Sequence, residues 1–414
     1  MLNRLQNDAR SSIIFGLALL MPASLFFSRT LLAISMLAFV MICLLHPRFK
    51  EYATKFLHTP FLWMMTLLFF VPLVSGAWSA DQRLWFDMTF TKLPLLFFPF
   101  AFAFPLGLSN RQWTILAVFM VILSSAGSIW SMTHYLQDTA GIHEGYLRSN
   151  TMLTPLDNDH VRYSWLVSVA VLTAVYTGWQ IRHQQKMLSL FLWLNAAWLA
   201  IFLHILAART GLFCLYGSVF LLGIWVMLKS RRLMTGALVL LLLTGLPLAA
   251  YYTLPTFKNR VHYILYDAGF IRNDEYLRNS NDGNRVISYK AGWALLQQQP
   301  VTGYGFGDIR AATHAWYDEN YPLLDEREKI YPSSEYLVYG AGAGWIGLLV
   351  CLAAMIIPFF TRVREKLPWY IIQAGIAGGF LFDIGLEVQF GVFLYTFITL
   401  GWWSWLSTNR TSEK

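Results

Sequence analysis

One arginine lies at the junction of two apolar runs, where a charged side chain is rare and expensive. Arg209 belongs to residues 206–212, Leu-Ala-Ala-Arg-Thr-Gly-Leu, which join the two runs with almost no loop and with no acidic residue nearby. Ionisable side chains at a membrane boundary are costly and usually functional. Thr210 can cap the following helix, whose N-terminal amides attract anions. We therefore predict an anion site at Arg209, with a headgroup-level anchor as the alternative.

A second polar cluster precedes the sixth apolar run of the chain. Asp157, Asp159, His160 and Arg162 lie within six positions of one another. Either aspartate can cap the helix that follows. Two arginines, Arg162 and Arg209, facing one cavity would suit a diphosphate, whose oxygens accept bidentate hydrogen bonds.

The longest polar segment, residues 253–332, has no apolar run of its own but is rich in aromatic residues. Loops of this length are usually functional or disordered, and disordered segments are poor in aromatics. We therefore predict a folded cap over a membrane-embedded site. The segment contains Asn284, Arg285 and a glycine run at 303–307. No strand is predicted before this run, so it does not fit a dinucleotide-binding fold, and its glycines are expected to allow a tight backbone path beside a ligand or the membrane.

The end of this segment supplies an acidic residue at the start of the tenth apolar run. In residues 332–337, Pro-Ser-Ser-Glu-Tyr-Leu, Ser333 or Ser334 can cap the helix, and Glu335 suits its first turn. Glu335 is also predicted to face the two arginines. His314 is a lone histidine in an aromatic loop, for which we favour a structural or surface role.

The composition is that of a protein with several membrane-spanning helices. Of 414 residues, 56% are hydrophobic and only 13% are charged, whereas soluble domains carry about 25% charged residues. The predicted fold is all-α, with about twelve transmembrane helices and a large, partly helical periplasmic loop. The predicted spans are centred on residues 12–27, 30–46, 61–78, 90–106, 113–133, 163–180, 188–207, 211–228, 233–252, 334–358, 369–387 and 389–407.

Basic residues are distributed unevenly between the two sides of these spans. Sixteen Lys and Arg residues fall in the segments on the side of the N-terminus, and six fall in the short segments on the other side. The positive-inside rule places the richer side in the cytoplasm. Both termini are then cytoplasmic. The predicted domains are 1–252, with nine helices and a smaller outer loop near 136–162, then the large outer loop 253–332, and 333–414 with three helices.

Charge and cysteine content argue against other classes of ligand. The net charge of +8 comes from basic residues at the ends of apolar runs, so it does not indicate nucleic-acid binding. The three cysteines, Cys43, Cys214 and Cys351, lie in apolar runs without the spacing of a metal site or a disulfide framework. We expect neither a metal nor a cofactor.

Together these features resemble the superfamily of O-antigen ligases and O-antigen polymerases, which are membrane glycosyltransferases. The resemblance rests first on about twelve spans, on Ala-Arg-Thr-Gly at residues 208–211 and on a large outer loop between late spans. It rests further on the order of motifs Asn284-Arg285, Trp293, Pro300, Gly303-x-Gly-x-Gly307, Tyr336-Leu337 and Gly347.

The resemblance implies a GT-C-like enzyme of the bacterial inner membrane that acts in lipopolysaccharide biosynthesis. Such enzymes transfer a glycan from undecaprenyl diphosphate to an acceptor hydroxyl on the periplasmic face, without metal or nucleotide. Arg162, Arg209 and Arg285 would hold the leaving diphosphate. The acceptor would be lipid A-core for a ligase, which we favour, or another glycan for a polymerase.

The sequence departs from the family pattern at a histidine. This histidine opens a His-Asn-x-Tyr/Phe-Leu motif, and Ser333 stands at its position here. Glu335, Asp159, His160 and His314 are therefore the candidates to assist the acceptor hydroxyl.

Two other classes of protein fit the sequence less well. A transporter of a lipid-linked saccharide often has internal repeats and charged or broken helices at the bilayer midplane, but the polar residues here gather outside the spans. A scaffolding protein would not require unpaired arginines at the outer boundary.

Overall fold

The computed structural model of the protein describes residues 2–229, 231–272 and 280–407. These residues form helices joined by turns, with no strand among them. The elements in chain order are α1 (Leu2–Phe27), α2 (Arg29–Leu44), α3 (Phe49–Leu57), α4 (Pro60–Ser75), α5 (Gln82–Thr91), α6 (Leu93–Ala103), α7 (Asn110–Gln137), α8 (Thr139–Leu147), α9 (Pro155–Asn158), α10 (His160–Ile181), α11 (Lys186–Leu206), α12 (Arg209–Lys229), α13 (Leu233–Thr253), α14 (Pro255–Arg272), α15 (Asn281–Gln298), α16 (Ile309–Asn320), α17 (Glu335–Ile356), η1 (Ile357–Phe360), α18 (Lys366–Gly379), η2 (Gly385–Glu387) and α19 (Gln389–Ser407).

Eight helical segments among the described residues are long and apolar enough to cross a membrane, as expected of a multi-pass membrane protein. The number becomes nine if α2 and α3, which bend by 109° at a short break, form one span. The eight segments are Ala9–Phe27, Gln82–Ala103, Asn110–Gln137, His160–Ile181, Lys186–Leu206, Arg209–Lys229, Leu233–Thr253 and Glu335–Phe360.

The structure does not confirm twelve continuous spans, because several predicted runs fold as short or interrupted helices. The run at 61–78 forms α4, which has only 16 residues. The run at 369–387 is divided into α18, with 14 residues, a turn and the short helix η2. Apolar composition alone does not reveal such breaks, because buried turns can be as apolar as the helices beside them.

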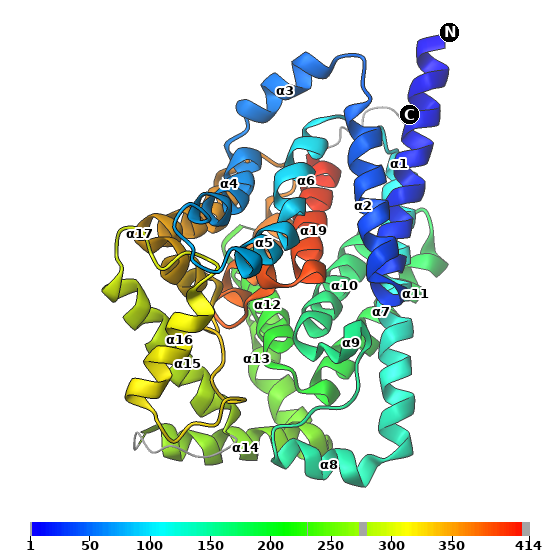
Figure 1. Ribbon diagram of the computed structural model, residues 1–414. Coiled ribbons are helices and arrows are strands. Elements are labelled where there is room, and N and C mark those ends of the chain that lie inside the picture. Colours follow the sequence, from blue (N-terminus) through cyan, green and yellow to red (C-terminus); the bar gives the residue numbers. More distant parts are fainter. Residues whose placement is uncertain (1, 230, 273–279, 408–414) are drawn as a thin grey trace.

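The two polar segments lie together at one end of the molecule. Figure 1 shows α8 and α14 side by side at this end, whereas α1 begins and α19 ends at the opposite end. The side-chain amide of Asn259 in α14 donates to the carbonyl oxygen of His143 in α8 at 2.9 Å. The long polar segment contains α14, α15 and α16, so it is largely helical where it is described.

The glycine run fastens this polar segment to the membrane helices. The amides of Tyr304 and Gly305 donate to the carbonyl oxygens of Ala341 and Gly342, at 2.8 and 3.0 Å. These carbonyls lie just before a break in α17, where Gly344 has a φ of 62°. The run therefore packs closely against α17, and a Cβ at Gly303 would overlap the backbone there.

One turn holds several polar contacts at the centre of the fold. Residues 380–388, which we call the connecting segment, join α18 to α19 and contain η2. Their backbone contacts helices from distant parts of the chain: the carbonyl of Phe380 accepts from the Glu335 amide at 3.0 Å, and the carbonyl of Ile384 accepts from Arg162 at 3.1 Å. This segment positions the site described next.

Candidate functional site

A basic pocket lies where α12 begins. Eight residues line it: His160, Val161, Ala207, Ala208, Arg209, Thr210, Arg260 and Arg285. We call it the arginine pocket. Its position depends on Ala207, which ends α11 in the left-handed conformation with a φ of 48° and turns the chain sharply into α12. Thr210 lies inside the first turn of α12 and is not the predicted N-cap, and the Gly211 amide instead donates to the Ser164 hydroxyl at 3.1 Å.

Arg209 lies at the mouth of this pocket and is paired with an acid that the sequence reasoning did not assign to it. The guanidinium forms an ion pair with Asp282, in the first turn of α15. The Arg209 side chain is 41% exposed and that of Asp282 is 11% exposed. The expectation that no acid pairs with Arg209 is therefore wrong, because chain folding brings in a residue 73 positions away.

Arg260 is a pocket residue that the sequence reasoning missed. It is buried, with 6% of its surface exposed, and its guanidinium lies over the rings of Tyr146 and Tyr263 at 5.2 and 6.0 Å from their centroids. Burial lowers the pKa of Arg260, and the nearby charge of Arg209 lowers it further. No motif surrounds this residue in the sequence, so only its contact with α8 reveals its place.

Arg285 completes a group of three arginines. Its guanidinium donates to the carbonyl oxygen of Phe382 in the connecting segment at 3.4 Å. Burial lowers its pKa, and so does the charge of Arg209. Arginine stays protonated in proteins, so three cations share this pocket, and Asp282 pairs with one of them at its edge. An anion with several oxygens would relieve their repulsion and accept their hydrogen bonds.

Of the predicted site residues at 159–162, one lines this pocket and the other two lie beside it. His160 lines the pocket. Asp159 caps α10, as predicted, by accepting from the Arg162 amide at 3.0 Å. Arg162 is not among the pocket residues: its guanidinium pairs with Asp159 at 2.8 Å and with Asp383 at 2.9 Å. The structure therefore brings Arg209 and Arg285 together with His160, and it places Arg162 in an ion-pair network beside them.

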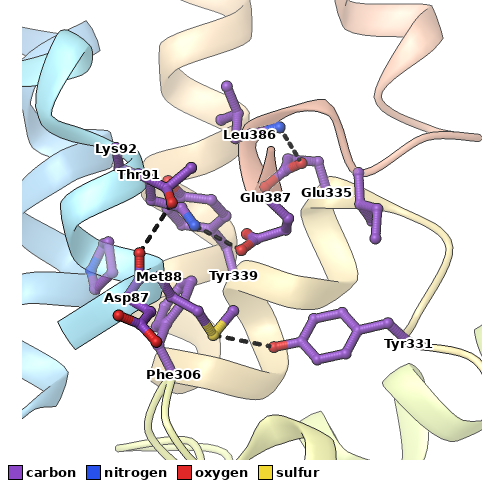
Figure 2. Close-up of polar contacts among 12 residues, drawn as sticks. Asp87, Met88, Thr91, Lys92, Phe306, Tyr331, Glu335, Tyr339, Leu386 and Glu387 are labelled. Atoms are coloured by element: carbon purple, nitrogen blue, oxygen red, sulfur yellow. Dashed lines mark hydrogen bonds and ion pairs between the residues drawn. The ribbon is translucent and has the colours of Figure 1, made fainter. Parts of the chain in front are cut away.

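Glu335 is enclosed at the start of α17, below the connecting segment. Its side chain is fully buried, and its Oε2 accepts from the Leu386 amide at 3.0 Å (Figure 2). Its Oε1 has no hydrogen-bond partner among the described residues. Ser334 takes the predicted N-cap position, but its hydroxyl accepts no capping hydrogen bond from α17 and instead donates to the Phe380 carbonyl at 3.2 Å.

A buried ion pair adjoins Glu335, and the sequence reasoning missed it. Lys92, between α5 and α6, donates to Oε2 of Glu387 at 2.6 Å, and neither side chain is more than 8% exposed. The Lys92 ammonium also lies 5.4 Å from the centroid of the Phe306 ring. Figure 2 shows Lys92, Glu387 and Glu335 grouped around the connecting segment. A lysine within an apolar run was the available sequence signal, but its partner is 295 positions away.

His314 lies apart from the arginine pocket. Its Nδ1 is 3.4 Å from an oxygen of Glu326, and it lines a second pocket with Arg310, Lys329 and Glu387 among other residues. This second pocket also borders the connecting segment, since Ile384 contributes to its wall.

A comparison with protein-family models now bears on this arrangement. The family model described as O-antigen ligase matches residues 194–352. This part of the chain is similar to the O-antigen ligase family. This match confirms the resemblance drawn from the motifs, and the matched segment includes Arg209, Arg260, Arg285 and Glu335. A search of the curated proteins found no match.

The match supports an enzyme of the glycosyltransferase kind, with a function of the O-antigen ligase or polymerase type. His160, Lys92 and Glu387 lie outside the matched segment, although they contact or adjoin residues within it. Ser333, at the position of the family histidine, forms a hydrogen bond with Ser288 at 2.9 Å between hydroxyl oxygens.

Proposed function

We propose that the protein is an O-antigen ligase that transfers a glycan from undecaprenyl diphosphate to a hydroxyl of lipid A-core. The observation that carries this proposal is the convergence of Arg209, Arg260 and Arg285 on one pocket at the N-terminus of α12. Three guanidinium groups and a helix N-terminus suit the several oxygens of a diphosphate. The family match at residues 194–352 supports a function of the ligase or polymerase type.

The arginines would act on the leaving group. In an inverting transfer, the acceptor oxygen bonds to the anomeric carbon while the bond from that carbon to the diphosphate breaks, and the diphosphate leaves with the electron pair. Negative charge grows on the diphosphate as the bond breaks. Preorganised cations around it stabilise this charge more strongly in a partly dry site than in water.

The membrane arrangement supports the same reaction. The donor lipid requires a site that opens to the bilayer near its surface, and the arginine pocket lies at the ends of α10, α11 and α12, which are candidate spans. With both termini in the cytoplasm, this end of the molecule faces the periplasm. The inner membrane of a bacterium would then hold the protein.

A transfer assay tests the proposal. Purified protein in proteoliposomes receives undecaprenyl-diphosphate-linked glycan and lipid A-core, and glycan-bearing lipid A-core is measured. We expect transfer by the wild type, a loss of about 100-fold or more in Arg209→Ala, by analogy with removal of one oxyanion-hole donor, and partial activity in Arg209→Lys. Arg148→Ala is the matched control, because it removes an arginine from an exposed ion pair with Glu144.

Two other outcomes would replace the proposal. Longer lipid-linked chains without modified lipid A-core would identify a polymerase. Movement of the lipid-linked glycan across the bilayer without any transfer would identify a transporter.

A further inference from the structure

The second pocket is larger and more open than the arginine pocket. It encloses about 750 Å³ including its mouth, and Arg310, His314, Lys329, Tyr331, Ile384 and Glu387 contribute to its wall. The arginine pocket encloses about 370 Å³ by the same measure. The connecting segment borders both, since the Phe382 carbonyl accepts from Arg285 and Ile384 lines the second pocket.

Most of the charge at the mouth of the second pocket is already neutralised. Lys329 is paired with both Asp318 and Glu326, and His314 also lies beside Glu326. Arg310 is different: it is exposed, and the described part of the chain offers it no ion pair or hydrogen bond. One available cation at the mouth suits a ligand that carries an anionic group.

At the base of the pocket lies a carboxylate that is only half satisfied. Oε2 of Glu387 accepts from Lys92, but Oε1 has no hydrogen-bond partner among the described residues, and the side chain is only 8% exposed. Glu335 beside it is more enclosed and does not line the pocket. A buried acceptor oxygen without a donor is costly, so a hydroxyl donor entering the pocket would complete the hydrogen bonding of Glu387.

We propose that the second pocket is the acceptor site and that Glu387 binds the acceptor hydroxyl and takes its proton. This inference rests on the proposed function. The acceptor oxygen bonds to the anomeric carbon, its proton moves to Oε1 of Glu387, and the diphosphate leaves toward the arginine pocket. Lys92 is a positioning residue that holds the Glu387 side chain in place through their ion pair. Arg310 pairs with an anionic substituent of the acceptor glycan, such as a core phosphate.

The arrangement gives each substrate a pocket of its own. The donor diphosphate is held on the side of Arg285, and the acceptor enters on the side of Ile384. The connecting segment, whose backbone is fixed by Glu335 and Arg162, borders both pockets. Glu335 thereby acts on the reaction through the shape of this segment rather than by contact with the acceptor.

Steady-state kinetics in proteoliposomes, with donor and acceptor varied separately, test the inference. A general base contributes about 100- to 10,000-fold, so we expect Glu387→Gln to lower kcat by at least about 100-fold. Binding of undecaprenyl diphosphate should not change. Because this variant leaves Lys92 unpaired, the double variant Lys92→Met, Glu387→Gln is the folding control, and it should bind the donor normally but not transfer.

The role of Arg310 at the mouth of the second pocket is tested separately. Arg310→Ala should raise the KM for phosphorylated lipid A-core about tenfold, with kcat and the donor KM unchanged, and it should not alter the KM for dephosphorylated lipid A-core. Arg327→Ala, an exposed arginine of the same loop that does not line the pocket, is the matched control.

The outcomes separate the two proposals. Transfer by Glu387→Gln within threefold of the wild type, or an unchanged acceptor KM in Arg310→Ala, would overturn the inference and leave the proposed function in place. A wild type that neither binds undecaprenyl diphosphate nor transfers glycan would overturn both.

Discussion

Replacing Asp282 with asparagine should strengthen binding of the donor diphosphate. Asp282 is ion-paired with Arg209 at the mouth of the arginine pocket, so a diphosphate must compete with this carboxylate for the guanidinium. Asparagine keeps the size and shape of the side chain but removes its charge. The expected effect is therefore the opposite of the loss that most changes in a binding site produce.

The solvent exposure of the Arg209–Asp282 ion pair determines how large the change in affinity should be. Arg209 is 41% exposed, and ion pairs at such positions contribute about 0.2–1 kcal/mol. Loss of this competition should lower the Kd for undecaprenyl diphosphate by about 1.5- to 5-fold. Asp282 also lies in the first turn of α15, where an acid contributes about 0.3–1 kcal/mol, so thermal stability should fall slightly while affinity rises.

The assay is a direct binding titration of undecaprenyl diphosphate in detergent at two ionic strengths. The gain should shrink at high salt, because partly exposed charges are screened. Asp157→Asn is the matched control, since Asp157 forms an exposed ion pair with Arg29 and does not line the pocket. The reasoning fails if affinity is unchanged or weaker in Asp282→Asn, or if the gain persists when Arg209 is alanine.

Three further predictions concern the scaffold of the site. Gly344→Ala should lower the yield of folded protein and the Tm, because Gly344 has a φ of 62° and a Cβ there would overlap the Pro300 carbonyl oxygen. Gly217 has open space around it, so Gly217→Ala should change neither the yield nor the Tm. Removing Lys92 or Glu387 alone should destabilise the fold by about 3–5 kcal/mol, and the double variant by less, as measured by thermal unfolding; additive losses would contradict a buried ion pair. Tyr146→Phe should cost about 1 kcal/mol, because its hydroxyl donates to the last carbonyl of α11 at 2.8 Å, and an unchanged Tm would count against that bond.

The candidate site was only partly predictable from the sequence. The residues that were predicted belong to local motifs, and those that were missed reach the site through contacts with residues distant in the sequence. Arg209 and Arg285 stand out because each belongs to a local motif, and His160 because it starts an apolar run. Arg260 and Glu387 carry no such signal. Arg260 enters the site through contacts between α14 and α8, and Glu387 through an ion pair across most of the chain.

The fold, like the site, was only partly predictable from the sequence. Apolar runs of about 20 residues are long enough to cross a bilayer as helices, so these runs determine that the chain is helical and multi-pass. The capping aspartate at 159 and the arginine between two apolar runs are likewise local, so pattern and spacing indicate them. Whether an apolar run continues as one helix or breaks into α18 and a turn depends on packing that hydropathy does not encode.

The sequence by itself determined the class of protein, the helical architecture and the presence of cations at the ends of the apolar runs, because these depend on composition and on residues a few positions apart. Only the tertiary structure decided which cations meet. It paired Arg162 with Asp383, gave Arg209 a partner in Asp282 and placed Glu387 at the base of a pocket. Charges find their partners across the folded chain, since the energy of an ion pair depends on distance in space and on burial rather than on separation in sequence.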